Sequence, residues 1–337
     1  MNNEELLNNF EKIYSTQIFP YVKSLEEYRI NERNKFYIYI ALIFATFFVT
    51  GSFALSIGVT LSMLVTIIWF IIFGSIFVKI APKVIAIPNE LRKKLKKELL
   101  TPILNIFGDF NVTDEEVITE GEIASTGLYG NIKTKDDDDK IKGIYKGVSI
   151  EIVETALACF DSDCYNFNGL IIKLRSNKNF NCNVSAKSKI NMKNIVTINS
   201  SYVTFNTPIM NLGKNNFEKI TFEDSEFNKE FTVRSDNQVE ARYLITPTFI
   251  EKIKEIKKET NVSCLDFAFK NGYFYLFLGN LTTEETQKQI NNYNGLFEIG
   301  SISKTILDKK IYFKVYKELL LIFSIIDCFK LDEKTGL

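Results

Sequence analysis

The feature that most constrains this chain is an uninterrupted apolar run near its N-terminus. Residues 36–78 contain no Asp, Glu, Lys or Arg, which makes 43 consecutive residues without a formal charge. A helix rises about 1.5 Å per residue, and one bilayer crossing takes about 20 apolar residues. The run is long enough for two crossings. A helix pair in a soluble core or a cleaved signal peptide fits it less well, so we expect a membrane protein.

Small residues interrupt the run near its middle. Gly51, Ser52, Ser56 and Gly58 separate two bulky apolar stretches, so we expect a turn within residues 50–58 and a transmembrane helical hairpin over residues 36–78. Lys and Arg precede and follow the run, whereas the turn has none. The positive-inside rule then predicts a multi-pass protein with both termini in the cytosol. Abundant Asn, Lys and Ile are typical of an AT-rich bacterial genome, which makes the expected location the bacterial inner (cytoplasmic) membrane.

Amphipathic helices are expected on both sides of the hairpin. Apolar residues recur every three or four positions in residues 1–35, which we expect to form a cytosolic helix. Residues 79–106 are expected to form a basic juxtamembrane helix. Its basic side chains are the candidate membrane-surface site: Arg92, Lys93, Lys94, Lys96 and Lys97. They either contact anionic lipid headgroups or only fix the orientation of the protein, and both interpretations stay open.

Residues 107–337 have the pattern of a cytosolic α+β domain. Short β-type runs cover residues 148–153, 170–174, 195–205, 231–233, 264–269 and 273–278. Asn271 and Gly272 separate the last two runs and predict a two-residue hairpin turn. Helices are expected after Pro247 and over residues 308–330, the latter too short in its apolar part to span a membrane. The fold class is α+β, with an N-terminal helix, the hairpin, and then a mostly antiparallel sheet with packed helices.

The order of these segments resembles the DUF3137 family of bacterial membrane proteins. The resemblance covers nearly the whole chain and is carried by the helical lead and paired spans, together with shorter landmarks. These landmarks are Ser125, Thr126, Gly127, Leu128, Tyr129, Asp139, Ile141, Gly143, Tyr145, Gly147, Ile150, Glu154, Phe167, Asn168, Gly169, Leu170, Phe217, Glu218, Phe227, Phe231, Val233, Ala241, Arg242, Tyr243, Leu244, Thr246 and Pro247. The family has no known function, so the resemblance implies only a membrane protein with a cytosolic domain. The chain departs from the family in the polar stretch 177–194.

Candidate chemistry is sparse. The chain has no histidine, which removes Ser-His-Asp triads and His-containing zinc sites, and it has no phosphate-binding glycine loop. Net charge is zero, so no nucleic acid partner is expected. The run from Asp136 to Asp139 is expected to be a solvated loop, with a Mg²⁺ or Ca²⁺ site as the less favoured reading, because consecutive residues of a strand alternate faces. Cys159, Cys164 and Cys182 are too loosely spaced for a zinc site, and neither metal nor cofactor is expected.

Three function hypotheses follow. The first is a non-enzymatic inner-membrane protein that presents a cytosolic binding or scaffold domain to a protein partner or to a second copy of itself. The alternative is a membrane-tethered enzyme that acts on a lipid or nucleotide through Asp136, Asp139 and Glu154, or a lipid-binding module that uses the basic helix. The spans contain hydroxyl groups and glycines but no ionisable group, which disfavours a channel.

Overall fold

The computed structural model describes residues 3–55, 59–159, 166–176, 179–189, 217–260, 262–282 and 302–329. The chain divides into two compact units. The helical unit comprises Met1–Ile103 and Phe297–Lys314, and the sheet unit comprises Leu104–Leu296 and Val315–Leu337. Residues late in the sequence therefore belong to the N-terminal unit.

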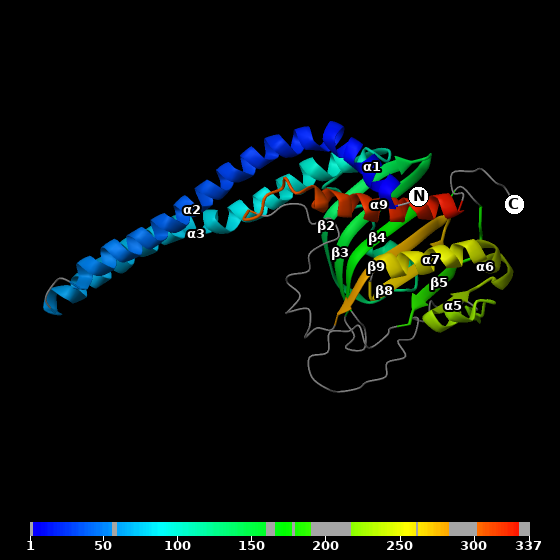
Figure 1. The fold of residues 1–337 in the computed structure, drawn as a ribbon. Coiled ribbons are helices and arrows are strands. Elements are labelled where there is room, and N and C mark those ends of the chain that lie inside the picture. Colours follow the sequence, from blue (N-terminus) through cyan, green and yellow to red (C-terminus); the bar gives the residue numbers. More distant parts are fainter. Residues whose placement is uncertain are drawn as a thin grey trace. The chain divides into compact units, whose positions relative to one another are not determined.

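The helical unit is built from a helical lead and two long helices (Figure 1). The lead is α1 (Asn3–Ile13), followed by a π-helical turn, η1 (Tyr14–Ile18), and the long helices are α2 (Phe19–Leu55) and α3 (Val59–Leu104). The expected helix over residues 1–35 thus continues into α2. The expected basic helix is likewise the end of α3, which passes through Pro82, Pro88 and Pro102 without ending. Of the range 50–58 predicted for the turn, residues 50–55, with Gly51 and Ser52, still belong to α2, and residues 56–58 lie outside the described residues.

The described residues of the sheet unit form a nine-stranded sheet in the order β1-β2-β3-β4-β9-β8-β5-β7-β6. The strands are β1 (Asp109–Val112), β2 (Ile132–Tyr145), β3 (Val148–Cys159), β4 (Asn166–Arg175), β5 (Val184–Ser188), β6 (Glu218–Ile220), β7 (Phe231–Ser235), β8 (Cys264–Lys270) and β9 (Tyr273–Thr282). Every described strand pair is antiparallel. The expected α+β class with an antiparallel sheet is therefore confirmed, while the run 195–205 lies outside the described residues.

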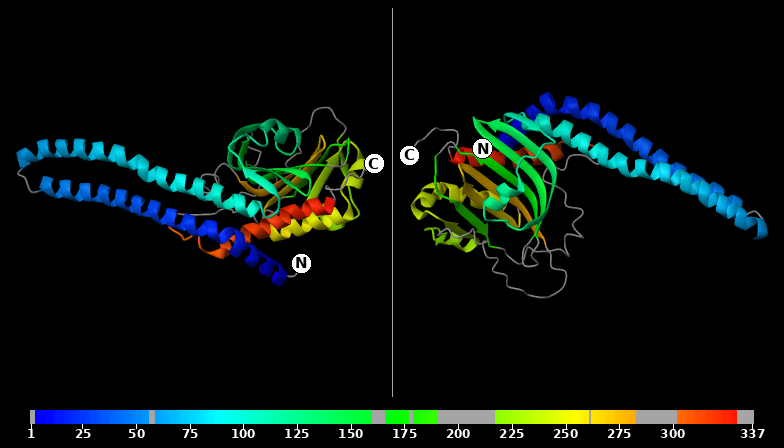
Figure 2. Two further views of the ribbon diagram at one scale, coloured as in Figure 1. Left: turned by 90° about the horizontal axis from the view of Figure 1, so that it is seen from above. Right: turned by 180° about the vertical axis from the view of Figure 1, so that it is seen from behind.

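Helices cover both faces of the sheet (Figure 2). They are α4 (Glu120–Ser125), α5 (Ser225–Glu230), α6 (Gln238–Leu244), α7 (Pro247–Thr260) and α9 (Lys309–Phe329). On one face, Phe249 of α7 contacts Phe267 and Phe274, and Phe323 of α9 contacts Phe110 of β1. The predicted docking of the last helix on the sheet is thus confirmed.

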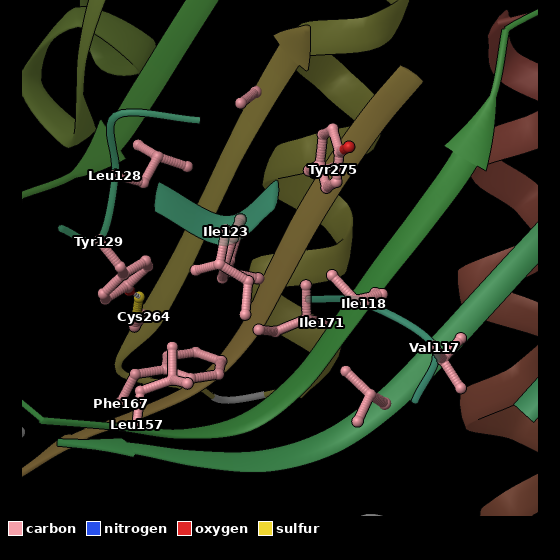
Figure 3. Close-up of a cluster of buried hydrophobic side chains, with 13 residues drawn as sticks. Val117, Ile118, Ile123, Leu128, Tyr129, Leu157, Phe167, Ile171, Cys264 and Tyr275 are labelled. Atoms are coloured by element: carbon pink, nitrogen blue, oxygen red, sulfur yellow. Dashed lines mark hydrogen bonds between the residues drawn. The ribbon is translucent and has the colours of Figure 1, made fainter. Parts of the chain in front are cut away.

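The opposite face carries a second core beneath α4. Cys264 and Tyr275 belong to this core, whereas Phe267 and Phe274 on the same two strands contact Phe249 of α7, as the period of two in a strand requires. Figure 3 shows Ile123 of α4 above Ile171 of β4, with Tyr129 beside Cys264 and Phe167. Because both faces are covered, strands such as β4 and β8 are buried along most of their length instead of alternating between buried and exposed residues.

The β8–β9 turn shows how local sequence sets the fold. Asn271 and Gly272 both have positive φ, 52° and 77°, which is the backbone of a two-residue type I′ hairpin. The turn fixes the register, in which Lys270 pairs with Tyr273 and Phe269 with Phe274. The predicted hairpin is confirmed. The helix expected after Pro247 is also confirmed as α7, and the Thr246 hydroxyl accepts the backbone N–H of Phe249 at its start.

Candidate functional site

The long helices α2 and α3 run antiparallel and side by side. Contacts between their described residues include Phe47 to Phe73, with ring centroids 5.9 Å apart, Lys83 Nζ over the ring of Tyr39 at 5.6 Å, and Lys94 Nζ over the ring of Tyr28 at 3.8 Å. In these three pairs the residue number falls along α2 as it rises along α3. The two numbers of each pair add up to nearly the same value, so the two helices keep one register along their length. The contacts fix the positions of the aromatic residues and the cations along the helix pair, because each residue of α3 is held opposite a given residue of α2.

Large apolar side chains of this pair are left uncovered. Phe48 is 69 % exposed, Ile71 65 % and Val78 71 %. Among the described residues, one stretch, Ile71–Leu104, is long and apolar enough to cross a membrane, and none of its most apolar part is buried. Exposed apolar surface on this scale marks an interaction with a membrane or a partner protein.

The five basic residues predicted to lie at the membrane surface are not equivalent. Arg92, Lys93, Lys94 and Lys97 are exposed, whereas Lys96 is buried. Leucines on the other side of this stretch, Leu91, Leu95 and Leu99, are buried, as their spacing of four predicts. The exposed basic face is thus made by four of the five residues.

A buried ion pair in α2 holds a distant segment of the helical unit, and sequence reasoning missed it. Arg29 donates two hydrogen bonds to the Glu26 carboxylate, at 2.8 and 2.7 Å, and a third to the Ile302 carbonyl at 2.7 Å. Glu26 in turn accepts the Thr305 hydroxyl at 2.9 Å and the Ile306 N–H at 3.1 Å. We call Glu26, Arg29 and residues 302–306 the clasp. Helical periodicity could not reveal the burial of Glu26, because its partners lie more than 270 positions later in the chain.

The charges of the clasp are mutually stabilised. Burial acts to raise the pKa of Glu26, but the hydrogen bonds from Arg29, Ile306 and Thr305 outweigh it and hold the pKa below the usual value. The hydrogen bonds to Glu26 also raise the pKa of Arg29. Both groups are therefore charged at neutral pH, and a buried pair of this kind is costly to break by removing one member.

The acidic run is not a solvated loop, and that prediction was wrong. Residues 136–139 lie within strand β2, which pairs with β3. Asp137 pairs with Thr155 and Lys140 with Val153, so Asp138 and Asp139 together lie opposite the single residue Glu154. This is a β-bulge, in which two residues of one strand oppose one residue of the next. The bulge interrupts the alternation of faces that had argued against convergence.

Three carboxylates meet at the bulge. Ligand oxygens of Asp138, Asp139 and Glu154 lie within 4.8 Å of one another, with Asp139 and Glu154 buried and Asp138 exposed. Of the carboxylates proposed for an enzyme, Asp139 and Glu154 are brought together, and Asp138 takes the place expected for Asp136. Oxygen ligands of this type suit Mg²⁺ or Ca²⁺. Such clusters are also common without an ion, so the arrangement assigns no reaction.

A second polar network lies in the core beneath α4, and sequence reasoning did not find it. Asp266 is fully buried and accepts three hydrogen bonds, from the Tyr129 hydroxyl at 3.0 Å, the Ser188 N–H at 2.7 Å and the Ser188 hydroxyl at 2.8 Å. Tyr129 also lies 3.1 Å from the Cys264 sulfur. Burial raises the pKa of Tyr129 and of Cys264, so both stay protonated at neutral pH. The network joins β5, β8 and the segment after α4.

The cysteines show no zinc site among the described residues. Cys182 is buried, and burial raises the pKa of its thiol to about 12, which disfavours the thiolate that a metal requires. Cys164 lies outside the described residues, as does the side chain of Cys159.

Comparisons with known proteins give two findings. The sequence model of a family described as "Protein of unknown function (DUF3137)" matches residues 165–331. The crystal structure of the mycobacterial trehalose monomycolate transport factor A, TtfA, shares 7 % sequence identity, and the match covers 69 % of this chain and 93 % of that chain with a TM-score of 0.28. A TM-score this low carries no argument about fold or function. No curated protein matches the chain.

Proposed function

We propose that this chain is a membrane-anchored binding protein. The family whose model matches residues 165–331 has no known function, so the proposal is argued from the structure. The apolar halves of α2 and α3 form a two-helix transmembrane hairpin in the bacterial inner membrane. The sheet unit lies in the cytosol and binds a protein partner or a second copy of the chain.

The exposed apolar surface of the helix pair carries the anchoring part of the proposal. The part of α2 from Phe36 onward and the part of α3 before Lys79 each contain 20 helical residues, about 30 Å, which matches the hydrocarbon thickness. Side chains such as Phe48 and Val78 are stable there only if hydrocarbon or another protein surface covers them. The matched lengths favour hydrocarbon. Cationic residues at the base of both helices and none in the turn favour cytosolic termini.

Exposed apolar residues on α6 support the partner-binding part. Val239 and Tyr243 lie one turn apart, and 81 % of Val239 and 45 % of Tyr243 are exposed. We therefore expect α6 to contact the partner. A photo-crosslinking residue at Val239 should give one specific product in cells. Crosslinking that returns only monomer counts against the binding role.

Fractionation and protease protection test the anchor. The full chain should stay in the membrane pellet after alkaline carbonate washing, and a protease added to spheroplasts should leave the sheet unit intact. Release by carbonate would overturn the anchor, and cleavage from outside would reverse the topology. The predicted contact of Arg92, Lys93, Lys94, Lys96 and Lys97 with headgroups stays a prediction of this proposal.

The three carboxylates at the bulge favour a second candidate function. A tethered enzyme that acts on a phosphorylated lipid or nucleotide would use Asp138, Asp139 and Glu154 to bind a cation or to move a proton. Turnover of such a substrate that is lost in Glu154→Gln, with the fold unchanged by circular dichroism, would place this function first.

A further inference from the structure

A polar pocket of about 540 Å³ lies in the sheet unit, at the end of β4 and beside the β8–β9 turn. The polar side chains that line it are Arg175, Ser176, Asn179, Asn181, Asn271 and Tyr273. Pockets that bind small molecules have volumes of about 300–1,000 Å³. The pocket is therefore large enough for a small ligand, and its lining suits a polar one.

Two contacts hold the walls of the pocket in place. The Ser176 N–H donates to the Gly272 carbonyl at 2.9 Å, which joins the end of β4 to the turn. Phe180 is buried, and its ring centroid lies 5.7 Å from that of Phe269 in β8. This contact fixes the neighbouring Asn179 and Asn181 against the sheet. The lining is thus positioned by the fold itself.

The charge of the lining is positive and has no partner in the protein. Among the described residues, no carboxylate lines the pocket, and the exposed guanidinium of Arg175 pairs with none. The Glu240 carboxylate adjoins the pocket, but it accepts the N–H of Asn181 at 2.7 Å and the side-chain amide of Asn237 at 3.3 Å. A guanidinium presents a planar fork of N–H donors that matches a carboxylate or a phosphate. An oxyanion in the pocket would therefore complete the contacts of Arg175.

A second unpaired cation lies in the same row of the sheet. Arg175 of β4 and Lys270 of β8 both pair with Tyr273 of β9, so the three side chains lie on one face. Lys173 shares this face, and two carboxylates accept from its ammonium group at 2.7 and 2.9 Å. Lys270 has no such partner among the described residues. The three cations outnumber the two carboxylates, which favours an anion at this end of the sheet.

Neutral hydrogen-bond donors line the pocket together with Arg175. The side-chain amides of Asn179 and Asn271 are exposed and make no hydrogen bond with another described residue. An amide has two N–H donors, and the Tyr273 hydroxyl has one. Because these groups share the pocket with the guanidinium, they can donate to the remaining oxygens of an anion that Arg175 binds.

We infer that this pocket binds a small ligand through a phosphate or carboxylate group. Arg175 binds the oxyanion, and Asn179, Asn271 and Tyr273 donate further hydrogen bonds to it. The inference goes beyond the proposed binding of a protein partner, and it does not depend on the membrane anchor, because every group of the site belongs to the sheet unit.

Nuclear magnetic resonance of small anions tests the site. The full chain in a maltoside detergent, which contains no phosphate, is mixed with inorganic phosphate or, separately, with isotopically labelled malonate at constant ionic strength. Exchange with a large protein broadens the signal of a small ligand, so phosphorus and carbon line widths measure binding. The wild-type protein should broaden at least one of the two signals, and the signal that broadens identifies the group as phosphate or carboxylate.

Matched variants separate a built site from a basic surface. Arg175→Gln should weaken the affinity about tenfold to a hundredfold, as expected when a hydrogen-bonded charge is removed. Lys270→Gln removes a cation of the same row that does not line the pocket, so it should change the affinity by less than about threefold. Tyr273→Phe keeps the ring and removes one donor, which should give a loss between the two.

Two results would overturn the site. The first is a wild-type protein that broadens neither signal. The second is an equal loss in Arg175→Gln and Lys270→Gln, because only a general attraction to cations predicts it. Circular dichroism of each variant shows that a loss of binding is not a loss of fold, and the exposed position of Arg175 makes a folded variant the expected result.

Discussion

The two units place the same residue type in opposite surroundings. In the helical unit, 59 % of Phe44 and 69 % of Phe48 is exposed, whereas in the sheet unit Phe267 and Phe274 are fully buried. Transfer of a phenylalanine side chain from water to an apolar environment lowers the free energy, whether that environment is a protein core or hydrocarbon. In the sheet unit, packing against other side chains removes the phenylalanines from water. In the helix pair, most of the surface of Phe44 and Phe48 is not covered by other side chains. This difference is the basis of our proposal that the two units are built for different solvents.

The largest effect is expected from removing a ring that the protein itself covers. Phe274→Ala opens a cavity beside Phe249, Phe267 and Phe269. The expected cost to the free energy of unfolding is about 3–5 kcal/mol. The matched variant Phe48→Ala removes a ring that is 69 % exposed and should cost less than about 1 kcal/mol in detergent. Chemical denaturation of both variants measures the difference, and equal costs would break the comparison.

The buried carboxylate of the sheet unit should come next. Asp266→Ala leaves the Tyr129 hydroxyl and both donors of Ser188 without their acceptor, at an expected cost of about 3 kcal/mol. Asp266→Asn keeps one acceptor oxygen and should cost less. Thermal unfolding compares the two, and an alanine variant as stable as wild type would show that the network contributes nothing.

A charge in the helix pair tests the solvent of that unit. Phe48→Asp places a carboxylate at an exposed position, where water would accept it at little cost. In hydrocarbon the expected cost is about 2.5–3.5 kcal/mol of insertion free energy. We expect reduced membrane insertion of this variant in a translocon assay, with Phe48→Leu as the control. Unchanged insertion would favour a helix pair that lies in water.

The smallest effect is expected from pH at the clasp. The pKa of Glu26 is lower in the folded protein than its ordinary value of 4.5, so its contribution is complete above pH 4.5 and is lost as pH falls through the folded pKa. Exchange of the Ile306 amide hydrogen, corrected for intrinsic rates, should accelerate in that acid range. In Glu26→Gln, the Ile306 amide should be less protected from exchange at all pH values, and its protection should not fall further in acid. An identical pH response in both proteins would rule out Glu26 as the titrating group.

Local signals predicted much of the fold. Asn271 and Gly272 set a turn by their own backbone preference, and the apolar spacing of Phe249, Ile250, Ile253 and Ile256 marked the buried side of α7. Gly169, one of the landmark residues, is a glycine for a steric reason. A Cβ at this position would lie 2.2 Å from the Leu278 carbonyl oxygen.

Contacts between distant residues could not be predicted in this way. The bulge at Asp138 and Asp139 exists only in the pairing of β2 with β3, and the burial of Glu26 depends on residues 302–306. A single sequence shows the polarity of these side chains but not their partners. The hydrogen-bond network of Asp266 could not be predicted for the same reason, because this residue lies in a strand whose other residues are mostly apolar.

The single tryptophan of the chain gives the most direct test of the membrane anchor. Trp69 belongs to the charge-free run of α3, so the native indole fluorescence reports on this helix alone. In vesicles made from lipids brominated deep in the acyl chain, the account predicts strong quenching of Trp69 and little quenching by aqueous iodide. Trp69 fluorescence that is not quenched by the brominated lipids but is quenched by iodide would contradict the membrane anchor.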